Sequence, residues 1–79
     1  MNVAVQAPDL GDGVTHAMIG AWHVSQGDRV RKDEPIVDVV TDKAAYEVLS
    51  PADGVLCEIC FSADEEFTAG AVLGRIQPA

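Results

Sequence analysis

Turn-forming residues interrupt this chain so often that long helices are excluded. Clusters of Gly, Pro, Asp and Glu occur at residues 9–13, 27–28, 33–35, 50–54 and 64–66, and such clusters mark loops. Between them lie stretches of strand length that are rich in Val, Ile, Leu and aromatic residues: Val3–Ala7, Ala17–Val24, Ile36–Thr41, Ala45–Leu49, Val55–Phe61 and Val72–Gln77. Short strands separated by turns are typical of a sandwich or barrel, so the sequence predicts an all-β fold.

An internal duplication makes this prediction more specific. Segment 24–39 recurs in outline 37 residues later as segment 61–76, with apolar residues falling on apolar residues. The matched pairs are Ser25 and Ser62, Asp28 and Glu65, Val30 and Phe67, Ile36 and Leu73, Val39 and Ile76, Ile19 and Leu56, and Trp22 and Ile59. We expect two similar halves related by a pseudo-twofold axis, because neither half could bury its apolar face alone.

Length and charge limit the functions that this chain can have. With 79 residues we expect one domain over 1–79, and a domain of this size buries only about 60% of the surface that its unfolded chain exposes. A core this thin leaves little room for an enclosed active site, so we expect no enzyme. We also expect the isolated domain to be a monomer. The formal charge of −8 repels nucleic acids and anionic membranes, and no apolar run has membrane-spanning length.

Two cysteines, Cys57 and Cys60, have the C-x-x-C spacing of redox and zinc sites. They lie in the strand-like stretch 55–61, where alternation would point the two sulfurs to opposite faces. The further candidate zinc ligands are His16 and His23, which form no second closely spaced pair. We therefore expect no metal or redox site, but two small apolar strand residues in a reducing compartment.

The segment that joins the two halves, 37–49, has the composition of a β-hairpin with its turn at Asp42-Lys43. Because neither turn residue is Gly or Asn, a type I turn is expected rather than a primed turn. Lys43 would project from the tip, where the carboxylate of Asp42 favours its charged ammonium form. Most surface lysines serve solubility, but only one other lysine exists, Lys32, and it lies in the charged cluster 31–34.

The residues around this turn resemble a known motif. The similarity begins with the run VTDKAAYEV at 40–48 and SPADG at 50–54, which is similar to the lipoylation motif of lipoyl domains in 2-oxo acid dehydrogenase acyltransferase components. It continues with PDLGDG at 8–13, which resembles the family's first loop, and with residues 22–30 and 69–73, which resemble its second strand and turn and its closing segment. Essentially the whole chain is covered.

This resemblance implies a fold, a cofactor and a site. The fold would be a flattened barrel or sandwich of two four-stranded antiparallel sheets, with the modified lysine on a hairpin and the termini at the opposite end. Lys43 would carry covalently attached lipoate, with Asp42 and Ala44 as flanking recognition residues. The domain would be a non-catalytic carrier with no catalytic or metal-binding residues, and its parent chain a dihydrolipoamide acyltransferase.

The same resemblance implies the partners. After a lipoate ligase modifies the domain, the swinging arm would carry acyl groups and electrons between a thiamine-diphosphate-dependent 2-oxo acid decarboxylase, the acyltransferase core and a dihydrolipoamide dehydrogenase. The loop from Asp9 to Thr15 would contribute to recognition by the decarboxylase. Thr41 and the alanines after Lys43 are more similar to pyruvate or branched-chain complexes than to 2-oxoglutarate complexes. Bacterial cytoplasm and mitochondrial matrix both fit this role.

The chain departs from the family pattern at two positions, and two other functions remain open. Asp12 stands where glutamate is usual, and Asp64 stands where the second half often has glycine, which predicts a differently built turn there. A biotin carrier domain of a carboxylase shares the fold, but it usually flanks its lysine with methionines rather than with Asp42 and Ala44. An unmodified interaction module, such as the barrel-like hairpin domains of transport adaptors, would leave the lysine at the turn unexplained.

Overall fold

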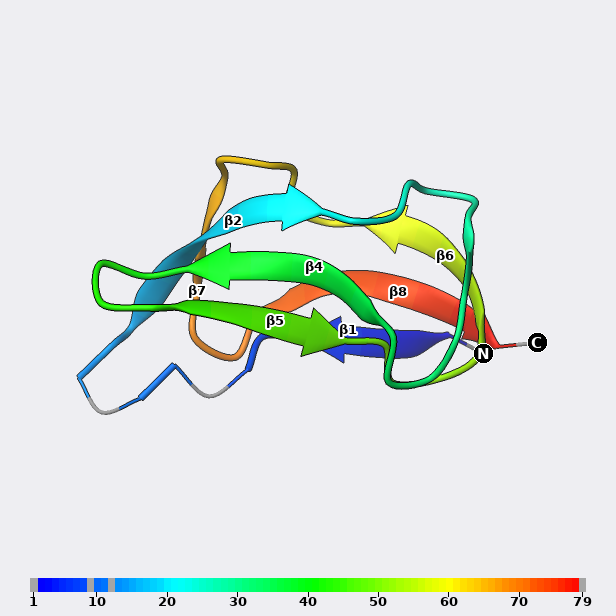
Figure 1. Ribbon diagram of the computed structural model, residues 1–79, viewed down its shortest axis with the longest axis horizontal. Helices are drawn as coiled ribbons and strands as arrows, with labels where there is room; N and C mark the ends of the chain where they lie inside the picture. Colours follow the sequence, from blue (N-terminus) through cyan, green and yellow to red (C-terminus); the bar gives the residue numbers. More distant parts are fainter. Residues whose placement is uncertain (1, 9, 12, 79) are drawn as a thin grey trace.

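The computed structural model describes residues 2–8, 10–11 and 13–78. These residues form strands and no helix: β1 (Val3–Gln6), β2 (His16–Trp22), β3 (Arg29–Val30), β4 (Pro35–Val40), β5 (Ala45–Leu49), β6 (Gly54–Ile59), β7 (Glu66–Thr68) and β8 (Val72–Pro78). They build two four-stranded antiparallel sheets, with strand orders β1-β8-β6-β3 and β5-β4-β2-β7 (Figure 1). The predicted all-β fold of two four-stranded sheets is therefore confirmed. No helix of the described chain is long and apolar enough to cross a membrane.

Most strands coincide with the predicted stretches, and the exceptions have simple causes. β3 and β7 were not predicted as separate strands, because runs of two and three residues are too short to show an alternating pattern. The predicted stretches 17–24 and 55–61 extend past the true strand ends at Trp22 and Ile59. Pro35 begins β4, a position where a missing N–H group is tolerated.

The strand register confirms the internal duplication. Ile19 of β2 pairs with Val39, and Leu56 of β6 pairs with Ile76, which is the equivalent pair in the second half. Each pairing is followed by a register shift of the kind that a β-bulge produces, and a bulge bends its strand. The two strand orders also correspond position by position: β1 is equivalent to β5, β8 to β4, β6 to β2 and β3 to β7. The halves are thus related by the predicted pseudo-twofold axis.

Equivalent turns in the two halves are held by equivalent hydrogen bonds. In the first half the backbone N–H of Ser25 donates to Asp28 Oδ2 at 2.8 Å. In the second half the N–H of Ser62 donates to Glu65 Oε1 at 2.7 Å. The matched serines and acids of the sequence are therefore turn residues in which the carboxylate satisfies a backbone donor.

The left-handed backbone positions are also duplicated, but glycine and aspartate exchange places. Gly27 has φ +96° and its equivalent Asp64 has φ +70°, whereas Asp33 has φ +68° and its equivalent Gly70 has φ +86°. The prediction that Asp64 makes a differently built turn is wrong. Aspartate tolerates the left-handed region better than most residues, so the same turn forms with either residue.

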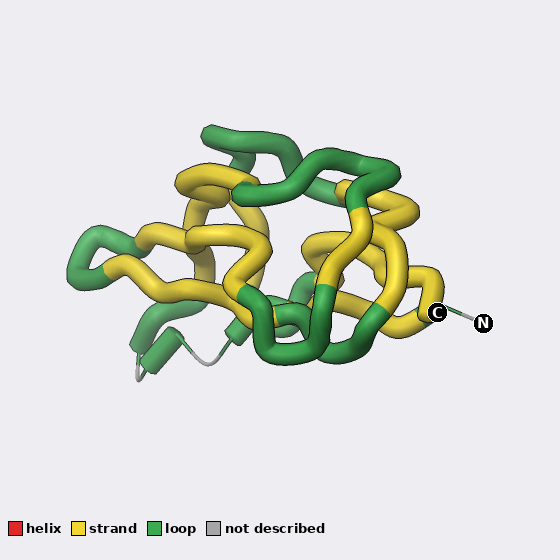
Figure 2. Tube along the Cα trace, turned by 45° about the vertical axis from the view of Figure 1, so that its right-hand side comes forward, coloured by secondary structure: helices red, strands yellow, loops and turns green. Residues whose placement is uncertain are grey.

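The core lies between the two sheets and uses the matched apolar positions. Members of three matched pairs have relative exposures of 0%: Ile19 and Leu56, Ile36 and Leu73, and Val39 and Ile76. Burying one such side chain contributes about 1.5–3 kcal/mol. The molecule measures 36 × 19 × 17 Å; the β4–β5 hairpin lies at one end of the long axis and the two chain ends lie together at the other (Figure 1). Figure 2 shows the same strand-and-loop architecture from a second direction.

Candidate functional site

The hairpin between β4 and β5 forms a tight turn that is closed by a side chain. The strands pair up to Val40 and Ala45, and the N–H of Thr41 donates to the carbonyl oxygen of Ala44 at 2.8 Å. The Thr41 hydroxyl accepts the N–H groups of Lys43 at 3.2 Å and of Ala44 at 3.0 Å. This use of a threonine hydroxyl in a turn was missed in the sequence, although threonine before the turn was the available signal.

The backbone of this turn agrees with the expected turn class. Among the described residues, the non-glycine positions with positive φ are Asp33 and Asp64. Asp42 and Lys43 are therefore not in the left-handed region, and a primed turn, which needs positive φ, is excluded as predicted.

Lys43 lies at the tip of the hairpin with an exposed side chain. Its predicted neighbours Asp42 and Ala44 are exposed as well. Within the described ranges, the basic and acidic side chains that meet at ion-pair distance are His23 with Asp38 and Arg75 with Glu58, so the Lys43 ammonium is in no ion pair. The side chain of Lys43 is therefore accessible to another molecule.

The first loop lies against the hairpin. Leu10 is buried, with a relative exposure of 4%, and its carbonyl oxygen accepts a hydrogen bond from the hydroxyl of Tyr46 at 3.5 Å. Because Tyr46 belongs to β5, this contact ties the loop to the hairpin close to Lys43. Asp9 and Asp12, two of the loop residues noted in the sequence, lie outside the described residues.

A shallow groove of about 460 Å³ opens between the end of this loop and the tip of the hairpin. It is lined by residues 13–18, by 40–43 and by Glu66. Its polar side chains include His16, whose Nδ1 lies 3.3 Å from the exposed Thr15 hydroxyl. The site therefore displays Lys43 on an open surface beside the first loop.

The two cysteines are free, and they differ in their surroundings. Cys57 is half-buried in β6, with its thiol 3.4 Å from the carbonyl oxygen of Arg75. Cys60 lies beyond the end of β6 and is exposed, so the prediction of an apolar strand residue is wrong there. Desolvation raises the pKa of the Cys60 thiol, and the charge of Glu58 adds to this effect while Arg75 opposes it. A thiol shifted in this direction is a poor nucleophile.

Comparison with known proteins places this geometry in a family. Residues 3–76 match the biotin/lipoyl family described as Biotin-requiring enzyme. The solution structure of the lipoyl domain of the 2-oxoglutarate dehydrogenase complex from Azotobacter vinelandii superimposes with a TM-score of 0.80 at 34% identity, covering 98% of each chain.

Two longer relatives extend the comparison. The chain is 38% identical over 79 residues to the dihydrolipoyllysine-residue succinyltransferase component of the 2-oxoglutarate dehydrogenase complex of Haemophilus influenzae. It is 41% identical over 75 residues to the dihydrolipoyllysine-residue acetyltransferase component of the pyruvate dehydrogenase complex of Corynebacterium glutamicum. The first match covers 100% of this chain and the second covers 95% of it. The chain spans only 19% of the length of the first relative and 11% of the length of the second.

The chain belongs to the biotin/lipoyl family of small β-sandwich domains. Within that family its fold and relatives are those of the lipoyl domains of 2-oxo acid dehydrogenase acyltransferases. The resemblance noted in the sequence is therefore confirmed.

Proposed function

We propose that this domain is a lipoyl carrier in which Lys43 is the attachment site of lipoate. The observation that carries the proposal is the placement of Lys43 alone at the exposed tip of the β4–β5 hairpin. The other lysine, Lys32, is also exposed, but its backbone N–H donates to Asp53 Oδ1 at 2.7 Å in a different turn. Position on a tight hairpin, rather than exposure, distinguishes the two lysines.

The surroundings of Lys43 fit a covalently attached acyl arm. Formation of an amide removes the ammonium charge, and among the described residues Lys43 has no ion pair that this step would break. The Thr41 hydroxyl fixes the backbone on both sides of the Lys43–Ala44 peptide. A rigid turn gives the modifying enzyme a defined geometry, to which the exposed side chains of Asp42 and Ala44 would contribute recognition.

The chain itself would position the arm, while lipoate supplies the dithiolane chemistry of acyl and electron transfer. Tethering raises the effective concentration of the carrier at each partner's active site. The first loop, held beside the hairpin by Tyr46, would add a surface for the 2-oxo acid decarboxylase. The acyltransferase core and a dihydrolipoamide dehydrogenase complete the set of partners, and the parent chain would be an acyltransferase component.

The choice of 2-oxo acid stays a prediction. Thr41 and the two alanines after Lys43 favour pyruvate or a branched-chain substrate, whereas the relatives compared above are named for 2-oxoglutarate and pyruvate complexes. Reductive acylation of the lipoylated domain by purified decarboxylases of each kind would decide between them. The relatives are bacterial, which favours a bacterial cytoplasm over a mitochondrial matrix.

The experiment that tests the attachment site is the intact mass of the chain after incubation with lipoate, ATP and a lipoate ligase. We expect one lipoyl increment on the wild type and on Lys32→Arg, and none on Lys43→Arg. An increment on Lys43→Arg would show that another amine is modified. A folded wild type that takes biotin from a biotin ligase but takes no lipoate would favour the biotin carrier, and failure with both would favour an unmodified interaction module.

The role of the loop needs a separate measurement. Exchanging residues 9–15 for the loop of another lipoyl domain should change the rate of reductive acylation while lipoylation by the ligase continues. An unchanged acylation rate would remove the loop from decarboxylase recognition without affecting the assignment of Lys43.

A further inference from the structure

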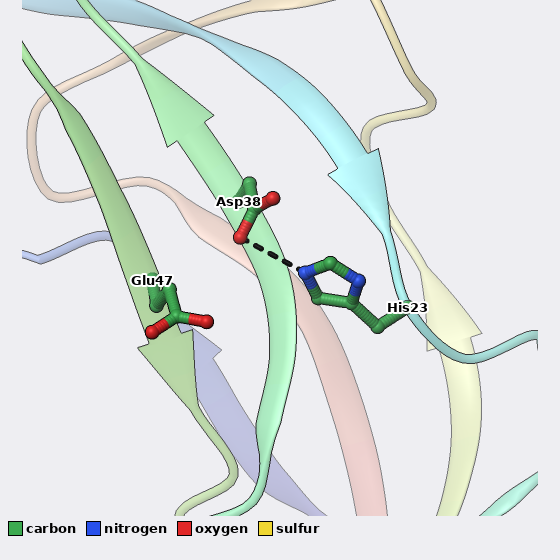
Figure 3. A group of neighbouring side chains, drawn as sticks. All are labelled: His23, Asp38 and Glu47. Atoms are coloured by element: carbon green, nitrogen blue, oxygen red, sulfur yellow. Dashed lines mark hydrogen bonds and ion pairs between the residues drawn. The ribbon is translucent and has the colours of Figure 1, made fainter.

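Three ligand-type side chains meet on the outer face of the β5-β4-β2-β7 sheet, away from the hairpin tip. His23 follows the end of β2, Asp38 lies in β4 and Glu47 lies in β5. Asp38 and Glu47 are direct cross-strand partners, and His23 Nε2 lies 2.9 Å from Asp38 Oδ1. One donor atom from each residue falls within 4.8 Å of the other two, and Figure 3 shows the Glu47 carboxylate and the imidazole on either side of Asp38.

The charge of this cluster is unbalanced in comparison with the equivalent place in the other sheet. There Arg75 takes the position of Asp38, it pairs across the strands with Ala4 in place of Glu47, and its Nε donates to Glu58 Oε1 at 3.1 Å. The β1-β8-β6-β3 sheet thus contains a neutral ion pair at this place. The β5-β4-β2-β7 sheet instead places the carboxylates of Asp38 and Glu47 directly opposite each other, an unfavourable pairing of like groups, and its only counterpart to Arg75 among the described residues is the His23 imidazole beside Asp38.

We propose that His23, Asp38 and Glu47 bind a divalent transition metal of the zinc class. One imidazole and two carboxylates are donors that Zn²⁺ accepts at about 2.0–2.2 Å, and the remaining positions would be filled by water. Ca²⁺ takes about 6–8 oxygen ligands and Mg²⁺ needs a near-ideal octahedron, so an imidazole beside two carboxylates suits neither ion. The metal would replace the missing positive charge of this face.

The geometry needs only a small adjustment to close around an ion. His23 and Asp38 already lie at a separation near that of two ligands on one zinc ion, which is roughly 3.3 Å for tetrahedral bonds of this length. Glu47 is exposed, so rotation of its side chain can bring its carboxylate in. Val37 and Val39, on either side of Asp38, are fully buried, and they hold the central ligand outward on a rigid strand.

This cluster could not be predicted from spacing, and the expectation of no metal site came from the orientation of the two cysteines, the spacing of the histidines and the family resemblance. The ligands come from two strands and from the segment that follows β2, and only the β4–β5 register and the path of the chain after β2 bring them together. No close sequence pair marks them. The site involves neither Lys43 nor a lipoyl group, so its test is independent of the proposed function.

The test is a calorimetric titration of the 79-residue chain with ZnCl₂, in a Cys60→Ser background that removes the exposed thiol as a competing ligand. We expect saturable binding of one Zn²⁺ ion. His23→Ala and Glu47→Gln should each weaken binding by at least about tenfold, the size of loss expected when a metal site is disturbed. His16→Ala removes the other imidazole of the chain and should leave the affinity within about twofold.

Each other outcome overturns the proposal. Absence of saturable binding up to about 1 mM Zn²⁺, where affinity is of the order of −4 kcal/mol, would show that the cluster is only a hydrogen-bonded surface group. Equal affinities of the wild type and His23→Ala would place the ion elsewhere. A ¹H–¹⁵N spectrum of each variant establishes that it is folded, and for a true site the zinc-induced shifts should centre on residues 23, 38 and 47.

Discussion

The hairpin that carries Lys43 and the pair of chain ends occupy equivalent places in the two sheets. Val40 pairs with Met18 near the hairpin, and the equivalent Gln77 pairs with Val55 near the chain ends. At the first place the chain turns back into β5; at the second, β8 ends beside β1. A duplicated fold therefore offers one hairpin tip at this position rather than two.

The equivalent turns of the two halves, in contrast, have kept the same geometry with different residues. They keep the same hydrogen bonds and the same left-handed positions, although Gly27 and Gly70 stand opposite Asp64 and Asp33. The carboxylate hydrogen bonds are common to both turns, and the left-handed position accepts either glycine or aspartate. At the hairpin the two halves differ in chain connection and in surface residues and not in the core.

The largest loss of stability is expected from adding a side chain at Gly54, where the equivalent position in the other half already has one. Gly54 is equivalent to Ala17, but a Cβ at Gly54 would overlap the carbonyl oxygen of Gln77. Gly54→Ala should lower the free energy of unfolding by about 3 kcal/mol, the upper end for overpacking. Ala17→Gly should lower it by only about 1 kcal/mol. Urea denaturation measures both, and similar values for the two variants would contradict the asymmetry.

The left-handed positions allow a matched exchange. Gly27→Asp should destabilise the first turn by about 1 kcal/mol, because a side chain is strained at φ +96°. Asp64→Gly should be neutral or stabilising by less than about 1 kcal/mol, because relief of strain is partly offset by a more flexible unfolded chain. Thermal denaturation of the two single variants provides the comparison; destabilisation by Asp64→Gly would show that its side chain has a structural role.

The hairpin turn should depend on the Thr41 hydroxyl, a feature for which the equivalent chain ends have no counterpart. Thr41→Val removes the acceptor of two backbone N–H groups, and it should reduce stability by about 1 kcal/mol, as loss of a capping hydroxyl does. Thr41→Ser keeps the acceptor and should stay within about 0.5 kcal/mol of the wild type. If Val and Ser variants behave alike in chemical denaturation, the hydroxyl does not hold the turn.

The smallest effect concerns Cys60, which occupies the place equivalent to His23. Because its pKa is raised, less thiolate is present at pH 8, and iodoacetamide should alkylate it more slowly in the folded chain than in urea. Arg75→Gln should slow the reaction further and Glu58→Gln should accelerate it, since their charges act in opposite directions. Equal rates in all three folded proteins would remove the electrostatic explanation.

Much of the fold could be predicted because its signals are local or repeated. Turn clusters divided the chain into strand-length stretches, and the matched pairs such as Ile36 and Leu73 identified core positions in both halves. The short strands β3 and β7 gave no separate signal, since two or three residues cannot show a period of two. Asp64 was misjudged because side-chain type alone does not reveal that an aspartate adopts φ +70°.

The site was predictable to a lesser degree. The hairpin and the exposure of Lys43 followed from its position between the halves. Closure of the turn by Thr41 depends on a side-chain rotamer, and the grouping of His23, Asp38 and Glu47 depends on strand register. Such features arise only when distant segments are placed in space, so composition and spacing do not contain them.

We propose that the position of the lysine on the hairpin, and not its exposure, makes it a carrier site. The double variant Asp42→Lys with Lys43→Asp keeps the composition and charge and moves the lysine by one residue along the same turn. Its intact mass after incubation with lipoate, ATP and lipoate ligase is the most direct test. We predict a lipoyl increment on the wild type and none on the folded double variant; equal modification of both would contradict the claim.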